Sequence, residues 1–493
     1  MTRRHGAAAI AALAIVWAPA APVADAPPRP GGLRQDLSAV LSAPLLARSH
    51  WGILVKSLDR GDVIFEHNSR KLVMPASNMK VFTMAAAAER LGWDYRFETT
   101  LESAAPVVGG VLTGDLIVRG GGDPSIGTRD GVAATTFDEW AQQLRAAGIA
   151  AIDGRIVGSD DALDDEELGS GWEWDDLAYA YSGPITGLVY NESLVRIDAR
   201  PGARPGDPAI LEVTPDGDHG LAVVNRVITA PAGEPESLEA RRARGSEILE
   251  VVGRVPAGRE RAATLTASVD NPTLFFARAL RSALIARGFR VSGDAMDADA
   301  LPPGDPARRA GTMAVLARHR SAPLAEIGRT FMKVSQNLYG ELIVKAVGRA
   351  AGEGTTARGQ QAIRETLSTW GVPADSYILA DGSGLSRRNF VSAEALVRIL
   401  EHVHADARHR DAFLQALPIG GQDGTLRNRL RASWTAGNVH AKTGSISNAR
   451  ALSGYVRTRR GETLVFSIVA NNFSLPAWRV ERVIDLLVEI LAR

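Results

Sequence analysis

The chain has 493 residues, more than the roughly 250–300 at which a single hydrophobic core stops growing, so two or more domains are expected. Hydrophobic residues make up 45% and charged residues 23%, as in ordinary globular proteins. Basic and acidic residues each number 56, so no net positive charge could hold a nucleic acid, and no nucleic-acid partner is expected.

The first 26 residues have the pattern of a secretory signal peptide. Arg3 and Arg4 give a positive start, residues 6–16 are almost entirely apolar, and small residues follow up to Ala26. The apolar run is shorter than the ~20 residues needed to cross a bilayer. We therefore expect cleavage and export to the periplasm or the extracellular space. An uncleaved N-terminal anchor is the alternative, and the cleavage position stays open.

The sequence contains no cysteine, although exported proteins often carry disulfides. Stability must therefore come from burial of the core. The absence of cysteine also excludes a thiol nucleophile, lipid attachment through cysteine and a cysteine-ligated zinc site.

The N-terminal part of the chain predicts a short series of elements before the first motif. Helical spacing over residues 35–47 is followed by two strands around a turn, at 51–56 and 63–65, and by a helix over 75–92 that ends at Gly92. Residues 27–32 are rich in proline and glycine and predict a flexible lead-in.

The helix over 75–92 begins with an S-x-x-K motif. Ser77 and Lys80 are three positions apart, so their side chains share one face of the helix. A partly buried lysine near a second cation can have its pKa lowered to about 7–8 and accept the serine proton. The N–H of a serine at a helix start can also stabilise an oxyanion. The alternative is a helix-capping serine followed by a surface lysine.

A long segment separates this helix from the second motif. Residues 98–265 show short strands with glycine and proline turns, interrupted only by a brief helix at 137–147. Such a stretch is too long to be a loop and predicts a β-rich inserted domain in two parts. A helical pattern resumes at Asn271. We therefore expect a catalytic domain made of residues 27–97 and 266–493.

The second motif is S-x-N, between two helical stretches. Ser335 could relay a proton to a leaving amine, and Asn337 could hold a substrate amide. Taken alone, this motif carries almost no information.

The C-terminal part predicts three strands, at 439–445, 449–458 and 463–471, and a closing helix at 477–493. Together with the two N-terminal strands they would complete one antiparallel five-stranded sheet flanked by helices. Both ends of the chain would then belong to a single domain.

The first of these strands carries a K-T-G motif at an expected sheet edge. Lys442 would supply a positive charge for a substrate carboxylate, and the Thr443 hydroxyl would hydrogen-bond it. Gly444 would leave room for the substrate backbone, and the N–H of Ser445 would be the second oxyanion donor. A solvated strand end is the alternative.

The three motifs together are far more specific than any one of them. Neither S-x-x-K nor K-T-G occurs elsewhere in the sequence, and their order matches one acyl-transfer site. The chain contains only six lysines against 50 arginines, and two of the six occupy motif positions. Lysine can lose its proton at working pH and arginine cannot, which favours a lysine base.

With these motifs the chain resembles the D-alanyl-D-alanine carboxypeptidase/endopeptidase family of class C low-molecular-mass penicillin-binding proteins. Further similar strings lie at 121–124, 381–386, 423–426 and 441–454. The resemblance implies an α+β, penicillin-recognising serine peptidase fold (β-lactamase/transpeptidase-like) interrupted by a large β-rich insert. It also implies that the insert contributes an acid near the site, from Asp175 or Asp176.

The resemblance implies a serine carboxypeptidase or endopeptidase that acts on peptidoglycan stem peptides through an acyl-enzyme on Ser77 and is inhibited by β-lactams. No cofactor or metal is expected. His402, His404 and His409 fall in a charged run that predicts a solvated helix rather than a metal site. A β-lactamase or esterase on the same fold, or a penicillin-binding sensor with little turnover, are the alternatives. Peripheral membrane contact, oligomeric state and the balance of the two peptidase activities stay open.

Overall fold

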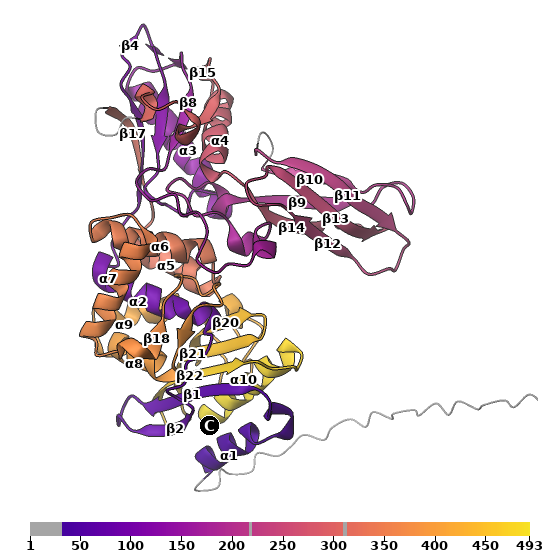
Figure 1. Ribbon diagram of the computed structural model, residues 1–493, viewed down its shortest axis with the longest axis vertical. Coiled ribbons are helices and arrows are strands. Elements are labelled where there is room, and N and C mark those ends of the chain that lie inside the picture. Colours follow the sequence, from indigo (N-terminus) through magenta and orange to yellow (C-terminus); the bar gives the residue numbers. More distant parts are fainter. Residues whose placement is uncertain (1–31, 216–218, 309–312) are drawn as a thin grey trace, which may run out of the picture.

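The computed structural model describes residues 32–215, 219–308 and 313–493, so the expected signal peptide and all of the expected lead-in except Gly32 lie outside the described residues. Both ends of the chain contribute to one body, in the lower half of Figure 1, and the residues between them form two lobes in the upper half. We call the lower body the peptidase domain and the two lobes the insert. Helices and sheets are combined in both, as in the expected α+β class.

The peptidase domain is built on one antiparallel sheet with the strand order β2-β1-β22-β21-β20. Its strands are β1 (His50–Ser57), β2 (Val63–His67), β20 (His440–Ile446), β21 (Ala449–Arg457) and β22 (Thr463–Asn471). β1 pairs with β22 along its whole length, with Trp51 opposite Ala470. The expected sheet of two N-terminal and three C-terminal strands is therefore confirmed, and β20 is one of its two edge strands.

Alternating side chains of the sheet face two different layers of helices. Trp51, Ile53 and Val55 of β1 share a core with the stripe of α10 that includes Val480 and Ile484. Leu54 faces the opposite way, into a core that contains Phe82 and Leu396. The first layer consists of α1 (Gly32–Leu41) and α10 (Ala477–Leu491). The helix expected at 35–47 therefore begins earlier and ends earlier.

The second layer holds the helices that carry the motifs. They are α2 (Met79–Leu91), α5 (Leu324–Lys333), α6 (Asn337–Ala350), α7 (Thr356–Thr369), α8 (Ala393–Ala405) and α9 (Arg410–Ala416). A two-stranded ribbon, β18 (Tyr377–Ile378) with β19 (Phe390–Val391), lies among them. α2 is almost entirely buried from Met79 to Ala88, which explains its run of alanines between α6, α7 and α8.

The first lobe of the insert combines two small sheets with two helices. One sheet has the order β16-β8-β6-β3-β17 and the other β15-β7-β5-β4. The elements are β3 (Glu98–Ser103), β4 (Val107–Val108), β5 (Val111–Leu112), β6 (Leu116–Arg119), α3 (Val132–Ala146), β7 (Ala151–Ile152), β8 (Ile156–Ser159), α4 (Pro272–Ala286), β15 (Arg290–Val291), β16 (Ala295–Asp297) and β17 (Ala314–Arg320).

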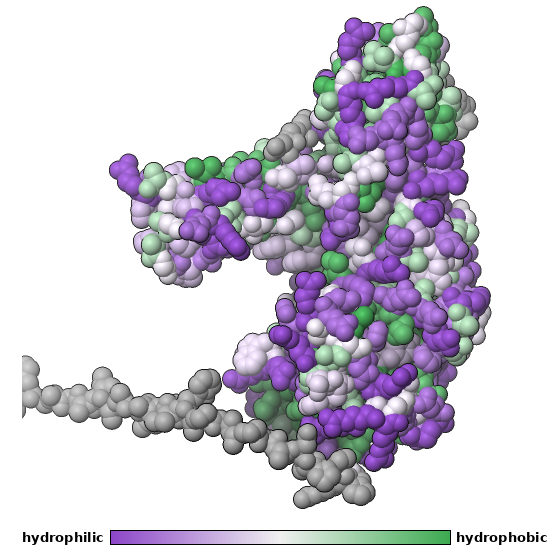
Figure 2. All heavy atoms as spheres, turned by 180° about the vertical axis from the view of Figure 1, so that it is seen from behind, coloured by the Kyte–Doolittle hydropathy of each residue, from purple (hydrophilic) through white to green (hydrophobic). Residues whose placement is uncertain are grey.

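The second lobe projects sideways from the first, and the regular elements among its described residues are strands (Figure 1). Its sheets have the orders β10-β9-β14 and β11-β13-β12. The strands are β9 (Leu194–Arg200), β10 (Ile210–Thr214), β11 (Ala222–Ala230), β12 (Ser237–Arg241), β13 (Ile248–Pro256) and β14 (Ala263–Ser268). Seen from behind, this lobe overhangs the peptidase domain and leaves a wide hollow beneath it (Figure 2).

The expected boundary at residue 265 does not coincide with the change from one body to the other. α4 packs against β8 and β16, and its Phe276 and Leu280 share a core with Phe137 and Trp140 of α3. Helical spacing shows that α4 has an apolar face but not which core that face joins. We therefore propose residues 98–320 as the inserted unit, from β3 to its antiparallel partner β17.

No helix among the described residues is long and apolar enough to span a membrane.

Candidate active site

Ser77 lies in a tight turn at the start of α2. Residues Ala76–Asn78 form a single 3-10 turn that runs directly into the helix. Ala76 has a φ of 48°, a strained conformation for a residue with a side chain, and such strain is typical of functional sites. The turn packs against Gly384, whose φ is 86°. A Cβ built on Gly384 would overlap the carbonyl oxygen of Ala76, so glycine is required there.

Lys80 is fully buried, and its amine is surrounded by three oxygens. Nζ donates to Asn337 Oδ1 and to the Ser383 carbonyl, each at 2.6 Å, and lies 3.0 Å from Ser77 Oγ. Two of these oxygens can only accept, so they take two N–H bonds of the amine. In the neutral amine, the lone pair is therefore left to face the Ser77 hydroxyl.

Burial lowers the pKa of Lys80 to about 7, although the nearby charges of Asp381 and Glu341 favour the protonated form. A lysine with such a pKa is a working general base near neutral pH. The structure thus brings the Lys80 amine within hydrogen-bonding distance of the Ser77 hydroxyl.

The loop at 381–386 provides the Ser383 carbonyl that accepts from this amine, and two carboxylates hold the loop in place. The Glu341 carboxylate of α6 accepts from the N–H groups of Gly382 and Ser383, each at 2.9 Å. These two bonds hold the peptide groups that directly precede the Ser383 carbonyl, which accepts from Lys80. Asp381 accepts from the N–H groups of Gly384 and Ser386 in the same way. The sequence at 381–386 is similar to the family, but only the structure shows that this loop contacts Lys80.

Ser335 and Asn337 lie at the junction of α5 and α6. Ser335 has a φ of 67°, and its Oγ accepts from Lys442 Nζ at 2.8 Å. Asn337 begins α6, where its Oδ1 accepts from Lys80 and its Nδ2 donates to the Tyr181 carbonyl of the insert at 2.8 Å. Asn337 therefore connects Lys80 to the insert.

Lys442 is fully buried in β20, behind the wall of the site. Its Nζ donates to Ser335 Oγ and, at 2.9 Å, to the Thr443 carbonyl. Burial, and secondarily the charge of Lys80, hold the pKa of Lys442 well below its usual value. Its amine does not line the cavity and contacts two residues that do, Ser335 and Thr443.

Of the other residues in the K-T-G strand, Gly444 is placed differently from what the sequence suggested. Thr443 lines the site and its Oγ1 lies 2.7 Å from Thr425 Oγ1. A Cβ on Gly444 would meet the Pro75 carbonyl and the Asn78 amide. The space at Gly444 is thus taken by the Ser77 turn and not left free for substrate. Ser445 is exposed in the cavity wall.

A cavity of about 470 Å³ joins these elements. Five predicted site residues line it: Ser77, Ser335, Asn337, Thr443 and Ser445. Sequence reasoning gave no role to several other lining residues, which come from the insert, two loops and strand β21: Glu173, Tyr181, Leu385, Arg387, Thr425 and Arg450. We call this space the active-site cavity.

One wall of the active-site cavity is a segment of the insert, residues 160–192, which we call the strap. Its Trp172 Nε1 donates to Asp381 at 3.0 Å, and its Glu173 accepts from Arg387 at 2.6 Å. Further along α6, the fully buried Lys345 donates to the Asp164 and Glu166 carbonyls and forms an ion pair with Asp164 at 2.6 Å. The strap is therefore attached to the peptidase domain at several points.

The structure separates the two aspartates that the sequence could not distinguish. Asp176 lines the active-site cavity and accepts from the Tyr181 hydroxyl at 2.7 Å, whereas Asp175 is not among the lining residues. Burial raises the pKa of the Asp176 carboxyl, and the charges of Glu173 and Asp175 act in the same direction.

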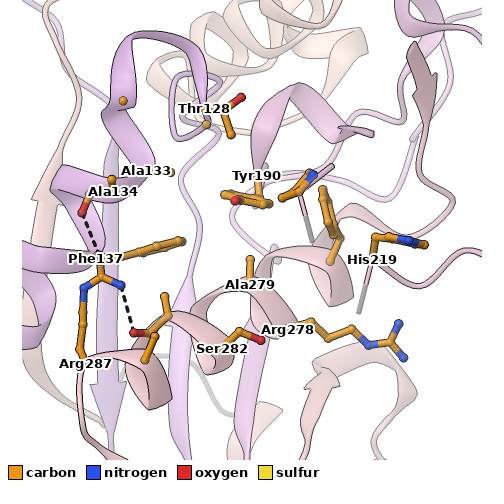
Figure 3. A pocket seen from close by; sticks show the side chains of 16 residues that line it. Thr128, Ala133, Ala134, Phe137, Tyr190, His219, Arg278, Ala279, Ser282 and Arg287 are labelled. Atoms are coloured by element: carbon orange, nitrogen blue, oxygen red, sulfur yellow. Dashed lines mark hydrogen bonds between the residues drawn. The ribbon is translucent and has the colours of Figure 1, made fainter. Parts of the chain in front are cut away.

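Two other features of the structure, a second cavity and a cluster of titratable side chains, contain none of the predicted site residues. A cavity of about 520 Å³ in the insert lies between α3 and α4 (Figure 3). Alanines and the rings of Phe137, Tyr190 and Phe275 line much of it, and none of the predicted site residues does.

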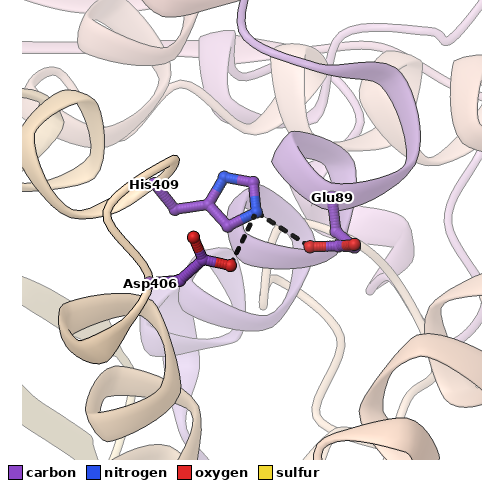
Figure 4. Close-up of side chains that lie close together, drawn as sticks. All are labelled: Glu89, Asp406 and His409. Carbon is purple, nitrogen blue, oxygen red and sulfur yellow. Dashed lines mark hydrogen bonds and ion pairs between the residues drawn. The ribbon is translucent and has the colours of Figure 1, made fainter.

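The second feature is the cluster of Glu89, Asp406 and His409 (Figure 4). His409 is buried, so the expectation of a solvated residue was wrong for it. Its Nδ1 accepts from Trp93 at 3.2 Å and its Nε2 lies 2.8 Å from Glu89. Both ring nitrogens are thus engaged in contacts between α2 and the turn that follows α8.

A buried lysine beside a serine, an antiparallel sheet with a K-T-G edge strand and a helical layer define the class of penicillin-recognising serine peptidases. The chain belongs to the D-Ala-D-Ala carboxypeptidase 3 (S13) family, whose pattern matches residues 33–493.

Individual relatives agree with this assignment. A D-alanyl-D-alanine carboxypeptidase of Actinomadura sp. (strain R39) is 36% identical, over 90% of this chain and 82% of that protein. The D-alanyl-D-alanine carboxypeptidase DacB of Haemophilus influenzae is 28% identical, over 88% of each chain.

Solved structures show the same fold. The crystal structure of penicillin binding protein 4 (dacB) from Haemophilus influenzae has a TM-score of 0.78 at 27% identity, covering 93% of this chain and 99% of that one. The same protein complexed with a β-lactam gives a TM-score of 0.72 at 26% identity, with the same coverage. The expected class of enzyme, a serine D-Ala-D-Ala carboxypeptidase, is confirmed, and neither alternative is favoured.

Proposed function

We propose that this carboxypeptidase acts through an acyl-enzyme on Ser77, with Lys80 as the general base. The observation that carries the proposal is the environment of Lys80 Nζ, which has two oxygen acceptors, a pKa lowered to about 7 and the Ser77 hydroxyl at 3.0 Å. The chemistry follows from these positions.

Ser77 Oγ attacks the carbonyl carbon of the penultimate D-Ala while its proton passes to Lys80 Nζ. The N–H groups of Ser77 and Ser445 stabilise the oxyanion. The C–N bond then breaks, and the proton that Lys80 took from Ser77 passes through the hydroxyl of Ser335, which is hydrogen-bonded to Lys442, to the nitrogen of the leaving D-Ala, so that Lys80 is neutral again. Water hydrolyses the resulting ester, which releases the shortened peptide and regenerates Ser77.

The substrate carboxylate is bound by the hydroxyls of Thr443 and Thr425, which lie 2.7 Å apart in the cavity wall. Lys442 supports this binding from behind through Ser335 and Thr443. On the opposite side, Asp176 faces the cavity from the strap and suits a cationic group on the stem peptide.

The substrates are peptidoglycan stem peptides, and β-lactams inhibit by acylating Ser77. One solved relative is a complex with a β-lactam, which supports β-lactam binding by this protein. Residues 1–26 direct export, so the enzyme acts on the wall from the periplasm or the extracellular side. The wide hollow under the second lobe accommodates a bulky polymer beside the peptidase domain (Figure 2).

The test is release of D-Ala from a diacylated peptide ending in D-Ala-D-Ala by the protein without residues 1–26. We expect release by the wild type and none by Ser77→Ala, with a labelled penicillin recovered on the peptide that contains Ser77. Release by Ser77→Ala, or an adduct on another serine, would contradict the proposal. A cross-linked dimeric peptide measured in parallel gives the balance of endopeptidase and carboxypeptidase activity.

A further inference from the structure

Three consecutive residues at the end of the strap have left-handed backbone conformations. Asn191, Glu192 and Ser193 have φ values of 52°, 59° and 59°. Such angles are uncommon for residues other than glycine, and three in a row persist only where the surroundings hold them. We call residues 191–193 the left-handed turn.

Hydrogen bonds hold this turn in place from several sides. Asn191 Oδ1 accepts from the N–H and the hydroxyl of Thr128, at 3.1 and 2.7 Å. Asn191 Nδ2 donates to the Leu194 carbonyl at 2.7 Å, and the Ser193 N–H donates to the Tyr190 carbonyl at 2.9 Å. The conformation is therefore imposed by the insert, and it fixes the direction of the Glu192 side chain.

That side chain reaches the peptidase domain. Glu192 Oε2 accepts from Gln336 Nε2 at 2.6 Å, and its Oε1 accepts from Arg129 Nε at 2.6 Å. The Glu192 side chain is only 11% exposed, so its charge is poorly hydrated and depends on these two donors.

Gln336 is the middle residue of S-x-N, between Ser335 and Asn337. Its Oε1 caps α6 by accepting from the Leu338 N–H at 3.1 Å, while its Nε2 is held by Glu192. Both ends of this amide are therefore fixed. The residue before it, Ser335, is itself left-handed, and the residue after it holds Lys80.

We propose that Glu192 is a positioning residue that acts through Gln336 to hold Ser335 and Asn337 in the geometry for acylation. The left-handed turn supplies the rigidity, Arg129 balances the charge of Glu192, and Gln336 transmits the position to the two residues that contact Lys442 and Lys80. The insert thereby has a part in catalysis separate from forming a wall for substrate. This inference rests on the proposed role of Ser77.

The test is a double-mutant cycle of Glu192→Ala and Gln336→Ala in the protein without residues 1–26. Active sites are first titrated with a labelled penicillin, so that acylation rates are expressed per competent site. We expect Glu192→Ala to slow acylation about tenfold, since misplacement of reacting groups by remote mutations costs up to ~100-fold. The double variant should acylate no more slowly than Gln336→Ala alone, because both changes break one connection.

The matched control is Glu102→Gln, another insert carboxylate in an ion pair, with Arg119 at 3.2 Å. Its acylation rate should equal that of the wild type. If Glu192→Ala fails to fold, Glu192→Gln keeps the size and an acceptor oxygen, and should slow acylation about threefold. Wild-type rates in whichever Glu192 variant folds, or losses that multiply in the double variant, would overturn the inference. A wild type that penicillin does not acylate at Ser77 would instead overturn the proposed function.

Discussion

The proposed role of Lys80 as the base depends on the surroundings of one buried amine. Its burial lowers the pKa to about 7, and the charges of Asp381 and Glu341 limit that decrease. Two oxygens that can only accept leave the third direction to Ser77. The charge state and the direction of the lone pair are therefore set by the same contacts.

The pH dependence of acylation follows from this pKa. Below about pH 7 the amine is protonated and cannot accept the serine proton, so the rate should fall about tenfold per pH unit; above it, the rate should level off. Stopped-flow acylation by a chromogenic cephalosporin between pH 5.5 and 9 measures this limb. A rate that does not change across that range would show that Lys80 is not the base.

Replacing Lys80 by arginine tests the same role without removing the charge. Lys80→Arg should abolish acylation, because guanidinium does not lose its proton at working pH. Penicillin labelling followed by mass spectrometry gives the readout, and Lys56→Arg is the control at a surface ion pair with Glu401. Labelling of Lys80→Arg near the wild-type rate would make Lys80 a structural residue.

Asp176 and Asp175 form a natural pair of test and control. Only Asp176 lines the active-site cavity, so Asp176→Asn should reduce kcat/KM for peptides with a free amino group before D-Ala-D-Ala about tenfold. Asp175→Asn should leave that preference unchanged. Measured with free and acetylated peptides, an equal loss on both substrates would contradict recognition of a cation by Asp176.

At the scale of elements, the Ser77 turn is shaped by two glycines of neighbouring segments. Gly444 of β20 allows the Pro75 carbonyl and Asn78 to approach the strand, and Gly384 does the same for the Ala76 carbonyl. The Asn78 side-chain amide, in the orientation that satisfies both of its ends, donates to the Lys442 carbonyl and accepts from the Gly444 N–H. The start of α2, the loop that contains Gly384 and the edge strand β20 are thus in close contact through their backbones.

Gly384→Ala should therefore displace the nucleophile. The added Cβ would overlap the Ala76 carbonyl, and we expect acylation to fall at least about 100-fold. Gly461→Ala is the matched control, because its φ of 87° equals that of Gly384 within a degree but its Cβ would meet no atom within 4 Å. Acylation rates per folded protein separate the two. Similar effects in both variants would mean that backbone strain alone is responsible.

At the scale of the whole molecule, the insert and the peptidase domain share one active site. The strap crosses from the insert to the peptidase domain and is attached to α6 at its first residue, Asn337, and about two turns further along, at Lys345. The chain has only six lysines, and the buried contacts with the strap explain why one of them is at position 345.

Lys345→Met should release one end of the strap. Loss of one partner of a largely buried pair costs about 3 kcal/mol, so thermal unfolding should shift to lower temperature. KM for the peptide should rise, while penicillin should still acylate Ser77 because the base and the nucleophile lie elsewhere. Lys56→Met is the surface control. Hydrogen exchange that stays unchanged in residues 164–176 would contradict the anchoring role.

The sequence by itself determined what depends on local spacing and on rare residue combinations. Ser77 and Lys80 are neighbours because three positions on a helix place two side chains on one face. The stripe of α10 and the alternation along β1 likewise follow from the periods of helix and strand. The three motifs predicted the site because few arrangements use them in that order.

Only the tertiary structure decided which surfaces meet. α4 has an apolar face that either core could bury, and its packing against β8 and β16 was settled by the fold. The sequence suggested that Gly444 leaves room for the substrate, but in the structure the Ser77 turn occupies that space. Glu192 and Gln336 lie 144 positions apart, and no local pattern links them. Such contacts depend on long-range packing, which brings together residues whose spacing in the chain carries no information.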